Sequence, residues 1–203
     1  MFRKSQNTAI EESDLKKVNI LAQIKMIDEY FNEANFLSWA QNIFLKLKNA
    51  FVERNIEAIK ELETKELFLE HSNQIRQYLE NKQIKMADKI AVNSVELYSF
   101  EHQDDRDKLK VRLTASMLEY VIDEETKKIK KGNKIFRKNK EYLIMFIRER
   151  SEFANKVKTN RTIECPSCGA ENTIIESGKC EYCGSIVKVA KYDWLLQEIV
   201  EIN

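Results

Sequence analysis

The feature that most constrains this chain is a duplicated Cys-x-x-Cys pattern near its carboxyl end. Its members are the only cysteines in the sequence: Cys165, Cys168, Cys180 and Cys183. A glycine follows each pair, and Gly169 and Gly184 can adopt the positive φ that closes a tight turn. Two such turns facing each other supply four thiolates in the tetrahedral arrangement that Zn²⁺ prefers. The spacing therefore predicts one bound zinc ion.

Two other uses of the cysteines fit the sequence less well. Disulfides would need an oxidising compartment, and the first residues, Met-Phe-Arg-Lys-Ser-Gln-Asn-Thr, lack the apolar stretch of a secretory signal. A redox-active Cys-x-x-Cys is normally single and stands at the start of a helix. Four thiolate ligands leave no coordination position open for water or substrate. We therefore expect a structural zinc ion and a cytoplasmic protein.

Composition sets limits on the remainder of the chain. Its 203 residues suffice for one sizeable core plus the small metal module. Charged residues make up 33% of the sequence, yet the net charge is only +1, so no global field favours nucleic acid as a partner. The longest apolar run, residues 142–147, is far shorter than the roughly 20 residues of a membrane span.

The first part of the chain has helical periodicity. We expect a helix over residues 13–31 with a Ser13 cap, and a second over 36–54 with an Asn35 cap. The second has the clearest apolar stripe, with a period close to 3.6 residues. A third helical stretch follows Asn55 and is expected to bend near Thr64.

The periodicity then changes to that of strands. Residues 108–122 alternate between apolar and polar side chains, which is typical of a half-buried strand. Further strands are expected over residues 90–100, 141–150 and 193–202. Helices followed by a meander of strands indicate an α+β fold, with the cysteine module inserted before the last strand.

Several segments in this order resemble a known family. They are Phe-Leu-Ser-Trp-Ala-Gln-Asn-Ile-Phe-Leu-Lys-Leu at 36–47, Val-Arg-Leu-Thr-Ala-Ser at 111–116, Tyr-Val-Ile-Asp-Glu-Glu-Thr at 120–126, Gly-Lys-Cys-Glu-Tyr-Cys-Gly-Ser at 178–185 and Asp-Trp-Leu at 193–195. Over roughly residues 35–203 the chain resembles bacterial Tim44-like proteins with an inserted zinc ribbon, often called zinc-ribbon transport proteins. These proteins are related to the carboxy-terminal domain of a subunit of the mitochondrial inner-membrane translocase.

The resemblance implies a cone-shaped fold like that of nuclear transport factor two. In this fold, N-terminal helices pack on the concave face of a curved antiparallel sheet and leave an apolar pocket. The mitochondrial relative binds acidic lipids and tethers the chaperone of the import motor. We expect a helical extension over residues 1–34, the Tim44-like cone over 35–160 and 190–203, and the zinc ribbon over 161–189.

Large apolar side chains on the expected helix and strand faces are candidates for lining the pocket. They are Trp39, Ile43, Phe51, Leu113, Phe146 and Trp194. A fully packed core is the alternative for each of them. If they line a pocket, its ligand should be a fatty chain or an amphipathic helix.

Basic residues concentrate in residues 127–140, which hold no acidic side chain. They are Lys127, Lys128, Lys130, Lys131, Lys134, Arg137, Lys138 and Lys140. These eight charges leave −7 on the rest of the chain, given the total of +1. The segment is either a solvated hairpin with lysines that prevent aggregation or a surface for anionic lipid or an acidic protein.

Nothing in the sequence indicates an enzyme or a nucleic-acid binder. Both histidines, His71 and His102, lie in polar stretches and are interpreted as surface residues, so the pocket lacks an evident base. Acidic residues around the cysteines oppose nucleic-acid binding. We expect a non-enzymatic binding or scaffold protein, linked to protein transport or membrane-associated assembly, whose partner is a protein or an apolar ligand. The alternatives are a peripheral protein at the inner face of the membrane and a small-molecule enzyme.

Overall fold

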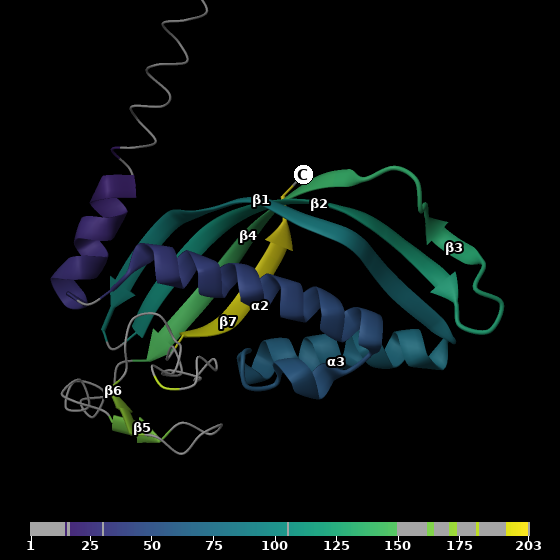
Figure 1. The fold of residues 1–203 in the computed structure, drawn as a ribbon, viewed down its shortest axis with the longest axis horizontal. Helices are drawn as coiled ribbons and strands as arrows, with labels where there is room; N and C mark the ends of the chain where they lie inside the picture. Colours follow the sequence, from purple (N-terminus) through teal and green to yellow (C-terminus); the bar gives the residue numbers. More distant parts are fainter. Residues whose placement is uncertain are drawn as a thin grey trace, which may run out of the picture.

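A computed structural model describes residues 15, 17–29, 31–104, 106–149, 162–164, 171–173, 182 and 194–202. Over these residues the chain has an α+β fold, in which helices pack on an antiparallel sheet, as the sequence predicts (Figure 1). Residues 17–27 are helical. The elements that follow are α2 (Glu33–Glu53), η1 (Ile56–Ile59), α3 (Lys65–Glu80), β1 (Gln83–Gln103), β2 (Arg106–Asp123), β3 (Ile129–Gly132), β4 (Lys138–Glu149), β5 (Thr162–Glu164), β6 (Glu171–Thr173) and β7 (Trp194–Glu201).

Helix α2 is the long helix that lies against the sheet. Its apolar stripe is the predicted one, and the buried residues are Phe36, Ala40, Ile43, Phe44, Leu47, Ala50 and Phe51. The predicted cap at Asn35 is wrong, because the side chain of Asn32 accepts the hydrogen bond from the Asn35 amide at 2.9 Å. The helix ends at Arg54, which adopts a left-handed φ of 55°.

The predicted bend near Thr64 separates two helical elements. The short 3₁₀ helix η1 is followed by α3, whose N-cap is Thr64, with its hydroxyl oxygen 3.4 Å from the amide of Leu67. Residues 62–64 also pair with the outer edge of β7, since Thr64 donates to the Leu196 carbonyl and Leu196 donates to the Leu62 carbonyl. The start of α3 is thereby fixed to the last strand.

The main sheet has the strand order β1-β2-β4-β7, with β3 paired to β2. In β2 every second residue from Leu109 to Met117 is buried, which confirms the predicted alternation. Strand β1 starts at Gln83 and not at residue 90 as predicted. Lys89 has a positive φ of 51° and the register shifts between Asp88 and Ala91, so the alternation that marks a strand is interrupted there.

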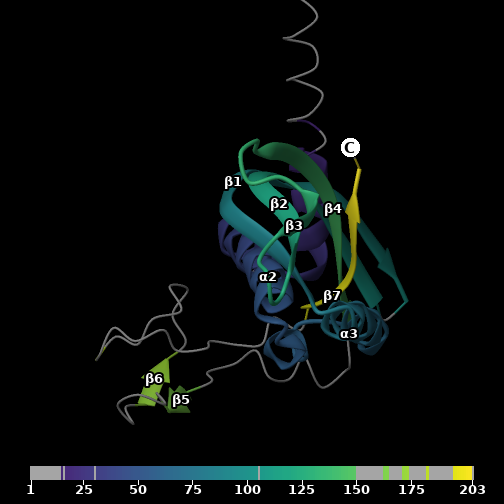
Figure 2. The ribbon, with the colours of Figure 1, turned by 90° about the vertical axis from the view of Figure 1, so that its right-hand side faces the viewer.

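The sheet curves over the helices, and α2 and α3 lie against the same face in both views (Figures 1 and 2). An aromatic cluster joins the two layers. The ring of Phe36 lies 5.6 Å from that of Phe146 and 5.7 Å from that of Trp194, while Trp39 lies 4.9 Å from Phe146. Such edge-to-face and tilted contacts stabilise a core beyond the burial of area alone.

A buried ionic cluster attaches the first helical segment to the sheet. Arg148 donates from Nη1 to Asp28 at 2.8 Å and from Nη2 to Asp107 at 2.7 Å. Asp107 has no exposed side-chain surface, and its other oxygen lies 2.7 Å from Nδ1 of His102. Ile20 and Ile24 belong to the same apolar core as α2. Residues 17–28 therefore pack with the remainder of the fold.

The two strands that follow β2 in the sequence, β3 and β4, both pair with it. Strand β3 pairs with Tyr120–Ile122, and β4 pairs with residues 106–117 of β2. Gly132 is required where β3 approaches β2: its φ is +80°, and a Cβ there would overlap the Glu119 carbonyl oxygen and lie 2.9 Å from Cα of Tyr120. Strands β5 and β6 form a separate two-stranded sheet.

Candidate functional site

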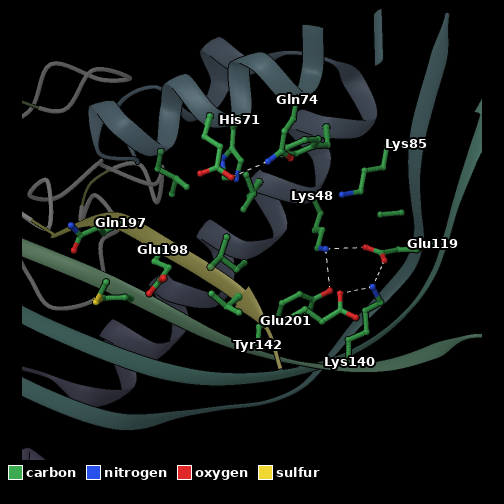
Figure 3. A pocket seen from close by; sticks show the side chains of 18 residues that line it. Lys48, His71, Gln74, Lys85, Glu119, Lys140, Tyr142, Gln197, Glu198 and Glu201 are labelled. Atoms are coloured by element: carbon green, nitrogen blue, oxygen red, sulfur yellow. Dashed lines mark hydrogen bonds and ion pairs between the residues drawn. The ribbon is translucent and has the colours of Figure 1, made fainter. Parts of the chain in front are cut away.

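A cavity of about 610 Å³ lies between α2, α3 and the concave face of the sheet (Figure 3). One part of its wall is apolar and includes Leu47, Phe51, Leu67 and Ile199. Another part is ionic and includes Lys48, Lys85, Glu119, Lys140 and Glu201. A ligand that fills the cavity would therefore meet apolar surface and charged groups together.

The ionic part is a chain of alternating charges drawn from four elements. Lys48 of α2 donates to Oε1 of Glu119 on β2 at 2.9 Å and to the hydroxyl of Tyr142 on β4 at 3.1 Å. Lys140 of β4 donates to Oε2 of Glu119 and, at 2.7 Å, to Glu201 of β7. Glu119 and the two lysines have side chains less than one fifth exposed, so the ion pairs are only weakly screened by water.

Burial and neighbouring charges shift the pKa values of the side chains in this ionic chain. Burial favours the neutral acid of Glu119, but Lys48 and Lys140 outweigh it and lower the pKa of Glu119 to about 2. Burial lowers the pKa of Lys48 despite the attraction of Glu119. Burial, followed by the charge of Glu119, raises the pKa of Tyr142, so its hydroxyl stays protonated at neutral pH.

Glu119 was missed by the sequence analysis, although the alternation of β2 contains a signal for it. Leu113, Ala115 and Met117 face the core, so residue 119 falls on the same face. A carboxylate at a core-facing position must be paired or pay a large desolvation cost. Its partners, Lys48 and Lys140, are distant in sequence and become neighbours only in the folded chain.

The interpretation of His71 as a surface residue is wrong. His71 lines the cavity and is 6% exposed, with Nδ1 2.7 Å from Oε1 of Glu63, which is itself 4% exposed. The ring of Phe51 meets the imidazole edge-to-face at 5.3 Å. Helix α3 is polar in sequence, so its buried histidine is evident only once the neighbouring loop and α2 are in place. His102, by contrast, is partly exposed beside Asp107.

The residues expected to line a pocket lie in two places. Phe51 lines the cavity. The other five do not border it: Ile43, Leu113, Phe146 and Trp194 are buried in the packed core, and Trp39 is half-buried against the same core. Within the described residues, the cavity therefore lies beside the aromatic cluster, on the side of α3.

The basic residues of 127–140 also divide into groups. Lys140 points into the cavity and is part of its ionic chain. Arg137 donates to the carbonyl oxygens of Lys89 and Ser116, Lys130 lies 3.3 Å from Asp123, and Lys134 lies 5.0 Å from the centre of the Tyr120 ring. The exposed remainder consists of Lys127, Lys128, Lys131 and Lys138.

Two apolar side chains project from the same basic segment. Ile135 is 79% exposed and Phe136 is 72% exposed, and their amides both donate to the side chain of Asn133. Large apolar groups this exposed beside several lysines form a surface patch that suits a membrane or a protein partner.

The predicted zinc ligands, Cys165, Cys168, Cys180 and Cys183, lie outside the described residues. Within the described part of the chain, no group of three or more His, Cys, Asp or Glu side chains could hold a metal ion. Among the helices that the structure describes, none combines the length and apolarity needed to cross a bilayer.

The structure is an α+β domain in which helices pack on a curved antiparallel sheet and a cavity lies between the two layers. The chain belongs to the Tim44-like domain family, because the sequence model of that family matches residues 18–160. This match starts before the predicted cone boundary at residue 35 and includes the helical segment joined to Arg148.

No curated protein matches the sequence significantly. Among solved structures, the chain is similar to the intermembrane space region of the chloroplast protein ARC6, with 11% identity and a TM-score of 0.41. The alignment covers 82% of this chain and 95% of that one.

Proposed function

We propose that this chain is a non-enzymatic binding protein whose ligand site is the cavity beneath the sheet. The observation that supports this most is the combination of an apolar wall with a complete ionic chain in one space of about 610 Å³. This volume lies in the range of typical small-molecule sites. Of the two expected ligands, a fatty chain or an amphipathic helix, a bare fatty chain fits less well, because it would leave these charges in contact with hydrocarbon.

The ligand is therefore amphipathic, either a single acyl chain with a polar end or an apolar peptide side chain carried by a polar backbone. Nile red, a neutral solvatochromic dye, tests whether the cavity admits such a molecule. We expect saturable binding of one dye per chain with a blue-shifted emission. Emission that rises linearly with dye, without saturation, would contradict the proposal.

The proposed fold type and cellular role of the protein are based on its family. We propose that the curved sheet and its helices form the cone of nuclear transport factor two, and that the protein serves protein transport or a membrane-associated assembly from the cytoplasmic side. The membership of the Tim44-like family and the two-layer packing of helices on an antiparallel sheet support this placement.

We also propose that the four cysteines hold one structural zinc ion. Strands β5 and β6 pair from Thr162↔Thr173 to Glu164↔Glu171, and Cys165 and Cys168 lie in the sequence between these two paired strands. Two Cys-x-x-Cys pairs are the ligand spacing typical of structural zinc sites, zinc ribbons included. The metal would supply folding free energy to a segment with few apolar residues.

A second candidate function is reversible binding to an anionic membrane through the basic segment. The exposed Ile135 and Phe136 favour it, because an apolar tip can insert among lipid headgroups while lysines meet the anionic surface. Each lysine near such a surface contributes about 1 kcal/mol. The lysines with the freest access are Lys127, Lys128, Lys131 and Lys138.

Flotation with vesicles of phosphatidylcholine and phosphatidylglycerol tests this second function. Reversing Lys128, Lys131 and Lys138 to Glu should release the protein, as should serine at Ile135 and Phe136. The matched control reverses Lys25, Lys46 and Lys65, which are also exposed and lie on helices. Equal flotation of both charge-reversed proteins would show a general charge effect and reject the basic segment as the binding surface.

A further inference from the structure

We propose that the cavity selects ligands that end in a single carboxylate, which binds between the ammonium groups of Lys85 and Lys48. This inference rests on the proposed ligand-binding function and specifies its ligand class. Figure 3 shows both ammonium groups pointing into the same space, from β1 and from α2 respectively.

Among the described residues, Lys85 is the lysine of the cavity wall that lies outside the ionic chain. Lys48 and Lys140 are matched by Glu119 and Glu201, which accept their hydrogen bonds. Lys85 has no ion pair to any carboxylate of the described residues. Its ammonium instead lies 5.0 Å from the centre of the Phe51 ring, a cation–π contact that supplies no negative charge. A ligand carboxylate would supply the missing counter-charge.

Repulsion between the two lysines supports the same position for the anion. The charge of Lys85 contributes, after burial, to lowering the pKa of Lys48. An anion placed between the two ammonium groups removes this repulsion and adds charge-assisted hydrogen bonds. The protonated hydroxyl of Tyr142, 3.1 Å from Lys48, offers a further donor in the same region.

The other carboxylates of the wall limit the charge of the ligand. Glu70 of α3 and Glu198 of β7 are exposed side chains that line the cavity, and Glu70 accepts a hydrogen bond from Gln74 at 3.2 Å. Together with Glu119 and Glu201 they outnumber the three lysines of the wall, so only a charge placed directly beside Lys85 and Lys48 is favoured and a second negative charge is repelled. A monoanionic carboxylate with an aliphatic tail therefore fits better than a phosphate dianion. The tail would contact Phe51, Leu67 and Ile199.

Competition for bound Nile red by three ten-carbon compounds tests the proposal: decanoate, decanol and decyltrimethylammonium. For the unmodified protein we expect decanoate to displace the dye at the lowest concentration. Lys85→Met should weaken decanoate about tenfold and leave decanol unchanged, since a charge-assisted hydrogen bond is lost. Lys85→Arg should retain most of the preference. Lys110→Met, at a lysine of β2 outside the cavity wall, should change nothing.

The outcomes separate this inference from the proposed function. Equal displacement by all three compounds would overturn the carboxylate preference while leaving the cavity as a ligand site. An equal loss in Lys85→Met and Lys110→Met would also overturn it, because it would point to overall charge. Absence of saturable Nile red binding would reject the ligand site itself, and the carboxylate preference with it. Thermal unfolding of each variant verifies that it is folded.

Discussion

The guanidinium of Arg148 makes two hydrogen bonds to Oδ2 of Asp107, at 3.0 and 2.7 Å, and Asp107 has no exposed side-chain surface. The same guanidinium lies 4.5 Å from the centre of the Trp194 ring and reaches Asp28 beyond the first helical segment. The residue after the first helical segment, Asp28, is thus joined to β2, β4 and β7 through this one guanidinium.

We predict that Arg148→Met strongly destabilises the fold, by about 3–5 kcal/mol, because it removes the guanidinium that hydrogen-bonds two buried carboxylates. The matched control is Arg106→Met, which removes an exposed pair with Glu149 at 3.2 Å and should cost less than about 1 kcal/mol. Urea unfolding measures both. Similar losses in the two variants would contradict the proposed role of Arg148.

The second prediction concerns acid stability. The folded-state pKa of Glu119 is about 2, below its ordinary value of 4.5, so the stabilising effect of its charge is complete above about pH 4.5 and is lost as the pH falls toward 2. At about 1.4 kcal/mol per pKa unit, this difference corresponds to at most about 3.5 kcal/mol, and screening by water reduces the expected loss to about 2–3 kcal/mol.

Unfolding free energies of the unmodified protein and of Glu119→Gln, measured from pH 6 to pH 2.5, test this effect. The gap between the two proteins should narrow as the pH falls. Glu96→Gln is the control, since that side chain is 54% exposed and pairs with Arg112 at 3.8 Å. A difference in unfolding free energy that stays constant over this pH range would contradict the lowered pKa of Glu119 in the folded protein.

Much of the fold could be predicted from the sequence, because the residues that the apolar periodicity marks as buried are the ones that pack against other elements. The stripe of α2 and the alternation of β2 each place their apolar residues on one face, and the structure buries those faces together. The sequence could not locate the start of β1, because the positive φ of Lys89 interrupts the pattern. It also missed His71 and Glu119, whose burial depends on Glu63 and Lys48 from other elements.

The third prediction concerns the single glycine outside the cysteine module. Gly132→Ala should destabilise the fold by about 1–3 kcal/mol, since φ is +80° and the added methyl group meets the backbone of Glu119 and Tyr120. Lys131→Ala, one residue earlier on the same exposed strand, should have little effect. Thermal unfolding distinguishes them, and equal midpoints would refute the required close approach.

The fourth prediction concerns the cysteines. Purified protein should contain one zinc ion per chain by elemental analysis, and Cys168→Ser should lower this content and expose the segment to proteolysis. Ser167→Ala, between the two cysteines of the first pair, is the matched control and should retain the metal. Zinc-free protein, or disulfides within the pairs in cytoplasmic material, would refute a structural zinc site.

The most direct test of the proposed function asks whether the space beneath the sheet is the ligand site. Ala87 of β1 lines the cavity, whereas Ala91 of the same strand does not. Phenylalanine at position 87 should fill the space and weaken Nile red binding by about tenfold or more, through loss of the apolar contacts. Ala91→Phe should bind the dye like the unmodified protein. Unchanged binding by Ala87→Phe, with its fold intact, would show that the ligand site lies elsewhere.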